Sequence, residues 1–145
     1  MNKRIIALLL AIAIAVSITP FSAFALEKVS NDTKASSYLD MYTASLSSKG
    51  ISGKLTLAYQ VVATHNMVKV GVWGIVVRNN DGTIHQYIHG TTANGLLISN
   101  DWYHIGNYTL NLTSGSTYYC TVIVVAEDAN GSDTRSITTQ QVVCP

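Results

Sequence analysis

The segment GKLTLAYQVVA, residues 53–63, shows the clearest apolar pattern in this 145-residue chain. Every second residue of its central part is apolar, and this row consists of Leu55, Leu57, Tyr59 and Val61. The positions between them include Lys54, Thr56 and Gln60. Because successive side chains of a β-strand point to opposite faces, the pattern predicts a strand with one face in a core.

On both sides of this segment the chain is rich in Val, Ile, Thr and Tyr and is interrupted at clusters of Gly, Asn and Asp. Strands and turns have this composition. The expected strands are residues 38–46, 53–63, 68–78, 83–89, 104–112, 117–127 and 133–143. Seven short strands in about 110 residues predict an all-β, antiparallel sandwich.

Two local features refine this fold. Asn79-Asn80-Asp81-Gly82 predicts a tight turn, and therefore a hairpin between the third and fourth strands. The third strand is apolar on both faces, as a central strand is. Glycines flank Trp73 in that strand, and we expect a bulge there.

Residues 1–25 are typical of a secretory signal peptide. A short basic start precedes an unbroken apolar run over residues 5–16, and Ala23 and Ala25 are the small residues that a signal peptidase reads. The apolar run is shorter than the roughly 20 residues of a membrane span. We therefore expect cleavage after Ala25 and a secreted, extracellular protein with no stable membrane anchor.

Cleavage there leaves a flexible polar leader, residues 26–35, and one β-sandwich domain, residues 36–145. Seven basic and eight acidic residues remain after residue 25. A protein that binds nucleic acid needs clustered Lys and Arg to neutralise phosphates, and anionic membranes attract the same residues. The near-neutral charge predicts neither partner.

The two cysteines, Cys120 and Cys144, lead us to expect one disulfide in a secreted protein. Each lies 12 positions from Ser132, in the last turn. A hairpin centred on that turn would place the two thiols opposite one another, between the last two strands.

Chemical motifs are few. The histidines His85 and His89 lie four residues apart on an expected strand, roughly 13 Å at about 3.3 Å per residue, which is too far for one metal ion. The acidic segment Asp128-Ala129-Asn130-Gly131-Ser132-Asp133 lacks the closing Glu of a calcium loop and is expected to be a turn. The chain has no Gly-x-Ser-x-Gly or His-Glu-x-x-His motif. We expect a protein that is not an enzyme, with no metal site and no cofactor.

Residues 112–132 resemble the end of a fibronectin type III or immunoglobulin-like domain. These families share a Leu, a Gly-Thr turn and a Tyr before alternating Val and Ala, then an Asn-Gly turn. The matching residues are Leu112, Gly115, Thr117, Tyr118, Val122, Val124, Ala126, Asn130 and Gly131. The resemblance implies an immunoglobulin-like sandwich with the third and sixth strands adjacent in one sheet. Tyr59 stands where antibody-type domains carry their first core Cys, so their inter-sheet disulfide cannot form here.

The chain after residue 25 is also similar to an uncharacterised family of small secreted bacterial proteins. The shared features are Tyr38-Leu39-Asp40, the Met67-x-Lys69-x-Gly71 pattern and Gly131-Ser132-Asp133. This second resemblance implies no activity.

If the third and sixth strands are neighbours, apolar residues opposite their core rows form one outer patch. We expect Trp73, Ile75 and Val77 on the third strand to face outward. The binding residues predicted from this patch are Trp73, Tyr119, Ile123 and Val125. The alternative is that the loop 90–103, with Trp102, folds over them.

The expected function is that of a small secreted recognition module for an unknown protein or glycan. Two alternatives stay open. A secreted toxin or antimicrobial effector would assemble on a target envelope, and a secreted hydrolase would gather polar residues in a cleft.

Overall fold

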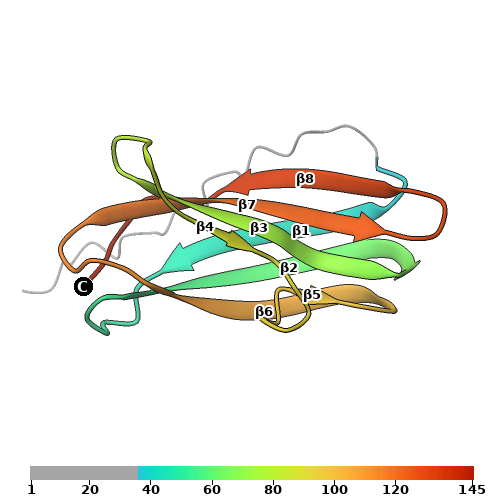
Figure 1. Cartoon of the computed structure of the whole chain (residues 1–145), viewed down its shortest axis with the longest axis horizontal. Helices are drawn as coiled ribbons and strands as arrows, with labels where there is room; N and C mark the ends of the chain where they lie inside the picture. Colours follow the sequence, from blue (N-terminus) through green and yellow to red (C-terminus); the bar gives the residue numbers. More distant parts are fainter. Residues whose placement is uncertain (1–35) are drawn as a thin grey trace, which may run out of the picture.

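The computed structural model describes residues 36–145, which fold into antiparallel β-sheets with no helix in that range (Figure 1). The expected signal peptide, 1–25, and the expected leader, 26–35, lie outside the described residues. The nine strands are β1 Leu39–Ser47, β2 Lys54–Met67, β3 Lys69–Asn79, β4 Ile84–His89, β5 Leu97–Ile98, β6 Asp101–Asn111, β7 Thr117–Glu127, β8 Ser132–Thr138 and β9 Val142–Val143. No helix among the described residues is long and apolar enough to cross a membrane.

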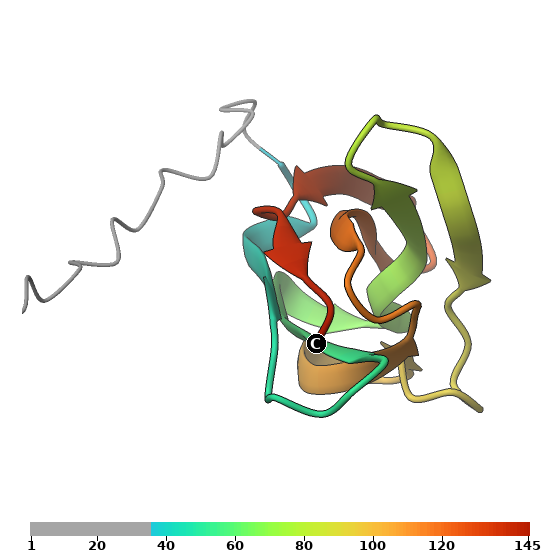
Figure 2. The same ribbon diagram turned by 90° about the vertical axis from the view of Figure 1, so that its left-hand side faces the viewer.

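The strands form two sheets. The smaller has the order β1-β2-β6, and the larger has the order β4-β3-β7-β8. The short strands β5 and β9 add to the larger sheet by pairing with β3 and β7. Figure 2 shows one end of the molecule, where the two sheets enclose the core. The all-β sandwich predicted from the sequence is therefore confirmed.

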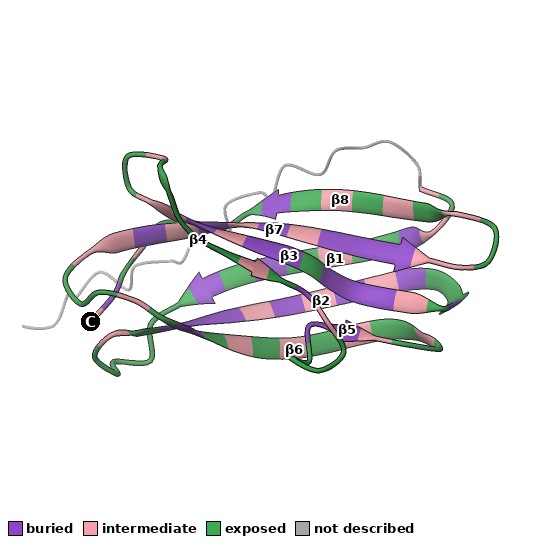
Figure 3. Cartoon of the chain, viewed as in Figure 1, coloured by how far each residue is buried: buried purple, intermediate pink, exposed green. Residues whose placement is uncertain are grey.

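The core comprises the inward rows of both sheets (Figure 3). The row predicted for residues 53–63 is buried in β2, and its partners in the larger sheet come from β3 and β7. Residues with no exposed surface in these three strands are Leu55, Leu57, Val61, Val70, Val72, Ile75, Val77, Cys120, Val122, Val124 and Ala126. Burial of such side chains contributes about 1.5–3 kcal/mol each for the larger ones and is the main source of stability.

The predicted hairpin and the predicted neighbours are both present. The β3 and β4 strands pair around the turn, with Ile75 opposite Ile88. The β3 and β7 strands pair along most of their length, with Val77 opposite Cys120. The last expected strand, 133–143, is interrupted and forms β8 and β9 instead.

The bulge expected around Trp73 is also present, and it corrects one expectation. The β3–β7 register shifts between Val72 and Gly74, so Trp73 is the extra residue. An extra residue reverses the facing of every side chain after it. Ile75 and Val77 therefore point into the core, with no exposed surface, rather than outward as the unbroken alternation predicted.

The disulfide prediction is wrong. Cys120 and Cys144 are free and fully buried. The turn is centred on residues 128–131, because Glu127 pairs with Ser132. The position opposite Cys120 therefore belongs to Thr139, whose N–H donates to the Cys120 carbonyl (2.9 Å). Cys144 instead lies beside Ser116, which directly precedes β7. Ser116 is four residues from Cys120 along the extended chain, or about 13 Å at 3.3 Å per residue. A disulfide requires Cα atoms within about 7 Å.

The loop between β4 and β6 is anchored in the core. Leu96 has no exposed surface, and its carbonyl accepts a hydrogen bond from the Val72 N–H (2.7 Å). The Tyr59 hydroxyl donates to the Gly95 carbonyl (2.8 Å), and His104 Nε2 lies 2.8 Å from the same oxygen. These contacts hold the loop along the edge of β3 and against β6.

Candidate functional site

The outer face of the larger sheet holds three of the four predicted binding residues. Ile123 lies opposite Gly74, and Tyr119 lies opposite Arg78, in register with the outward positions of β7. Both are half-buried, and Trp73 is 36% exposed. The fourth residue, Val125, is only 5% exposed and is paired on both sides, by Gly71 and Thr134. Val125 therefore offers almost no surface to a ligand, and its assignment to the patch is wrong.

Trp73 is the centre of this face. Its ring meets the His89 ring edge-on, with centroids 4.8 Å apart. Lys69 Nζ lies 5.2 Å from the Trp73 ring centroid and 3.0 Å from Glu127 Oε2. The indole is thus held between an imidazole and an ion-paired ammonium, while more than a third of it stays open to solvent.

Tyr87 completes the face because β3 has a glycine beneath it. A Cβ built at Gly74 would lie 2.8 Å from the Tyr87 hydroxyl oxygen, so the phenol ring lies over the bare backbone. Tyr87 is nevertheless 52% exposed. We call the group consisting of Trp73, Tyr87, His89 and Ile123, bordered by Lys69 and Glu127, the Trp73 surface.

Sequence reasoning missed Tyr87, His89 and Lys69. The signal was the hairpin turn at 79–82, since its register places Tyr87 opposite Val76 and His89 opposite Gly74. The outward set of β4 follows from this register once the bulge in β3 is known. If the bulge is ignored, the β3 residues after Trp73 are assigned to the wrong face of the sheet, and so are the β4 residues that pair with them.

The loop that could have covered the patch does not do so. Trp102 belongs to β6, in the smaller sheet, and is 49% exposed. Its ring contacts Tyr103 at 5.0 Å between centroids. The rest of the loop follows the edge of β3 through β5 instead of crossing its outer face.

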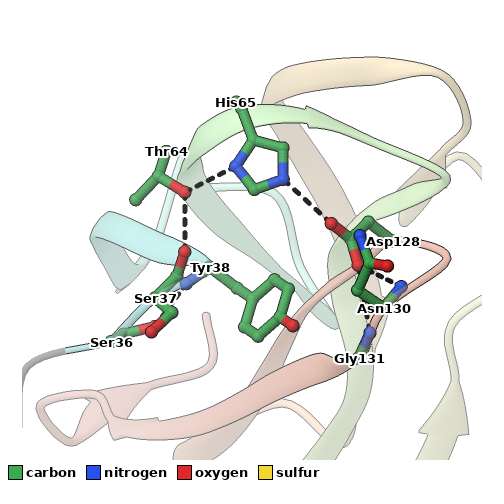
Figure 4. A network of polar contacts seen from close by, with 8 residues as sticks. All are labelled: Ser36, Ser37, Tyr38, Thr64, His65, Asp128, Asn130 and Gly131. Atoms are coloured by element: carbon green, nitrogen blue, oxygen red, sulfur yellow. Dashed lines mark hydrogen bonds and ion pairs between the residues drawn. The ribbon is translucent and has the colours of Figure 1, made fainter.

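A second polar cluster lies at one end of the sandwich (Figure 4). His65 Nε2 lies 3.0 Å from Asp128 Oδ2, and His65 Nδ1 lies 2.9 Å from Thr64 Oγ1. The Thr64 hydroxyl donates to the Ser37 carbonyl (2.9 Å). The cluster links the segment just before β1, the end of β2 and the β7–β8 turn, where Asp128 Oδ1 accepts the Gly131 N–H (3.0 Å).

The Asp128 carboxylate, the His65 imidazole and the Thr64 hydroxyl are the kinds of group that form a proton relay. The Thr64 hydroxyl proton, however, is not directed at His65. The Thr64 hydroxyl donates this proton to the Ser37 carbonyl. Hydrogen bonding to His65 is the largest cause that holds the pKa of Asp128 below its usual value. The arrangement is a clasp between three segments.

The acidic segment that begins at Asp128 forms the turn between β7 and β8, as predicted from its sequence. Asp128 Oδ1 also accepts the Asn130 N–H (2.7 Å), and Asp133 Oδ1 is ion-paired with Arg135 (2.8 Å). In residues 36–145, no group of three or more His, Cys, Asp or Glu side chains could hold a metal ion.

Comparisons with family models, with curated proteins and with solved structures found no match to this chain. The immunoglobulin-like and bacterial-family resemblances therefore stay predictions. The chemistry of the Trp73 surface can still be stated from its atoms. Flat aromatic faces bind apolar faces of a ligand, while Lys69, Glu127 and His89 offer hydrogen bonds at the border.

Proposed function

We propose that this chain is a small secreted recognition module, non-catalytic and immunoglobulin-like in fold, that binds a protein or glycan through the Trp73 surface. The observation that carries the proposal is the exposure of Trp73 and Tyr87 on a sheet face whose other aromatic and charged groups hold them in place.

The energetics of such a surface favour recognition. Trp and Tyr bury a large area while losing little side-chain entropy, so they dominate the binding energy of many interfaces. Trp73 loses less still, because His89 and Lys69 already contact its ring. A preorganised aromatic group costs less free energy to immobilise on binding.

Two features support the immunoglobulin-like part of the proposal. The third and sixth strands predicted from the sequence are neighbours, as the resemblance implied. The β3–β4 hairpin also belongs to this sheet, with β4 at its edge. The secretory part rests on the basic start, apolar run and small residues of positions 1–25.

The test compares two tryptophans on different sheets. The purified chain and its Trp73→Ala variant are screened on a glycan array and on an array of cell-surface proteins. Trp102→Ala is the matched control, because Trp102 is also exposed but belongs to the smaller sheet. We expect Trp73→Ala to weaken capture about tenfold or more, and Trp102→Ala to leave it within about twofold.

The thermal midpoint of each variant separates binding from folding. Loss of capture by Trp73→Ala with an unchanged midpoint supports the Trp73 surface. Equal capture by the native chain and Trp73→Ala, or loss only in Trp102→Ala, would contradict it.

A further inference from the structure

The chain contains two Asn–Gly pairs, and the structure places them in different surroundings. Asn94 and Gly95 lie in the loop before β5, whereas Asn130 and Gly131 lie in the turn between β7 and β8. Each pair follows an alanine, and both asparagines are exposed. An asparagine before a glycine can lose its side-chain amide, because the glycine nitrogen attacks the carboxamide carbon and no glycine side chain hinders the approach. The two pairs therefore offer the same local chemistry in two structural settings.

The Asn130–Gly131 pair has a carboxylate at the nitrogen that would attack. Asp128 Oδ1 accepts the Gly131 N–H (3.0 Å) and the Asn130 N–H (2.7 Å) (Figure 4). The other oxygen, Asp128 Oδ2, lies 3.0 Å from His65 Nε2, and this contact helps to orient the carboxylate. A general base acts within about 2.6–3.2 Å of the proton donor. The group that can take the proton thus already contacts the N–H that must lose it.

The Asp128 carboxylate is ionised at neutral pH and also meets the Asn130 side chain. Hydrogen bonding with His65 is the largest cause that lowers the pKa of Asp128, and hydrogen bonds with the Asn130 backbone and side chain lower it further. The carboxamide of Asn130 and the N–H of Gly131 are therefore gathered at one carboxylate. This turn holds the nucleophile, its base and the group to be attacked together.

The Asn94–Gly95 pair lacks a carboxylate, and its carboxamide is held in place. Asn94 Oδ1 accepts the N–H groups of Thr91 (2.9 Å) and Leu96 (3.3 Å). Asn94 Nδ2 donates to the His89 carbonyl (2.8 Å). The Gly95 N–H donates to a backbone carbonyl of the same loop (3.3 Å), which is a far weaker base than a carboxylate. Attack at Asn94 must break these bonds, so we expect this pair to be protected while the chain is folded.

We propose that Asn130 is a self-modification site, at which the Asp128 carboxylate acts as the base for closure of a cyclic imide between Asn130 and Gly131. A bond forms between the Gly131 nitrogen and the Asn130 side-chain carbon, and the bond from that carbon to Nδ2 breaks. The Gly131 proton passes through Asp128 to Nδ2, which leaves as ammonia. Water then opens the imide at either carbonyl, to give an aspartyl or an isoaspartyl residue.

The product changes the β7–β8 turn. Either acid adds a second carboxylate beside Asp128, and like charges at this distance repel. The isoaspartyl form also lengthens the backbone of the turn by one CH2 group. We expect both changes to weaken the contact between Asp128 and His65. Asp128, Asn130 and Gly131 are not part of the Trp73 surface, so the site does not depend on the proposed function.

Peptide mapping by mass spectrometry tests the proposal on the native chain. The purified protein is incubated at neutral pH, folded or in urea, and the conversion of both asparagines is followed in each sample. In the folded chain we expect Asn130 to convert at least about tenfold faster than Asn94, and faster than Asn130 does in urea. A turn that merely leaves Asn130 unprotected would reach at most the rate in urea. The difference between the two asparagines is expected to disappear in urea, because both follow Ala and precede Gly.

One substitution removes the base. Asp128→Asn keeps an oxygen that can accept the Gly131 N–H, and it is expected to slow the conversion of Asn130 at least about tenfold. Asp101→Asn is the matched control, because the Asp101 carboxylate also accepts a backbone N–H, that of Trp102 (2.7 Å), and it is expected to leave the rate unchanged. The Asn94 rate in each variant reports whether the chain is still folded.

Three results would overturn the proposal. The first is a folded-state rate at Asn130 that is no higher than the rate in urea. The second is equal conversion of Asn94 and Asn130 in the folded chain. The third is an unchanged Asn130 rate in Asp128→Asn while Asn94 keeps its folded-state rate. The first two comparisons use the native chain alone, so they decide the question even if Asp128→Asn unfolds.

Discussion

The Tyr59 hydroxyl oxygen and His104 Nε2 lie 3.0 Å apart, and each lies 2.8 Å from the Gly95 carbonyl oxygen. Tyr59 comes from β2, His104 from β6, and Gly95 from the loop that precedes β5. The Tyr59 hydroxyl has one proton, which it donates to Gly95, so the second bond to this carbonyl requires a proton on His104 Nε2. One backbone oxygen therefore anchors the loop to two strands of the opposite sheet.

Replacement of Tyr59 by Phe removes one of these two donors. Because His104 still serves the Gly95 carbonyl, the oxygen is not left without a partner, and we expect a loss of about 1 kcal/mol in the free energy of unfolding. Urea denaturation measures this loss. A change of about 3 kcal/mol or more would instead show that His104 does not compensate.

The same residue predicts a dependence on alkaline pH. Burial raises the pKa of Tyr59 above its ordinary value of 10.0. The unfolded chain then releases the phenol proton at a lower pH than the folded chain does. The contribution is fully present below the unfolded pKa and is lost as pH rises through the folded pKa. Tyr59→Phe is expected to reduce the fall of the urea midpoint between about pH 9 and 11. Tyr103→Phe, an exposed control, is not expected to do so.

Gly106→Ala is expected to destabilise the fold through the same contact. A Cβ at position 106 would clash with the Tyr59 hydroxyl, and Tyr59 is buried. Overpacking of this kind costs about 1–3 kcal/mol. The loss should be partly relieved when Gly106→Ala is made in a Tyr59→Phe background, because the hydroxyl is gone while the ring carbon Cζ, 2.7 Å from the added Cβ, remains. Strictly additive losses in the double variant would argue against this clash as the cause.

Asp128→Asn is expected to flatten the acid side of the stability profile. The pKa of Asp128 lies below its ordinary value of 3.8, chiefly because of its hydrogen bond with His65. A lowered pKa gives stability that is present above the unfolded value and is lost as pH falls through the folded value. His65→Gln should produce part of the same change, and Asp40→Asn, at an exposed carboxyl, should produce none. Urea midpoints from about pH 2 to 6 measure these effects, and an unchanged acid limb in Asp128→Asn would contradict the assignment.

The two thiols are expected to be unreactive in the folded protein. Cys120 and Cys144 have no exposed surface, and burial raises the pKa of Cys120 to about 12. The thiolate is the reactive form, so a thiol reagent at neutral pH should label neither cysteine until urea unfolds the chain. Intact mass spectrometry then counts the labels. A chain that takes no label even in urea would contain the disulfide that the structure excludes.

Much of the fold can be predicted from the sequence, because its signals are local. The alternation over 53–63 determines a strand with one buried face, since side-chain period follows from backbone geometry alone. The Asn-Asn-Asp-Gly turn at 79–82 determines a hairpin, because few residues adopt its backbone conformation. Trp73, Tyr119 and Ile123 could be assigned to the outer face from these patterns.

Only the tertiary structure decided the facing and register beyond such points. The bulge at Trp73 turned Ile75 and Val77 inward, because one extra residue reverses every side chain that follows. The centre of the last turn, at 128–131 rather than Ser132, moved Cys144 away from Cys120. The approach of Tyr87 to Gly74, and so the shape of the Trp73 surface, depends on how two strands pair across the sheet. Sequence period sets which residues alternate, but the pairing of strands distant in sequence sets which of them meet.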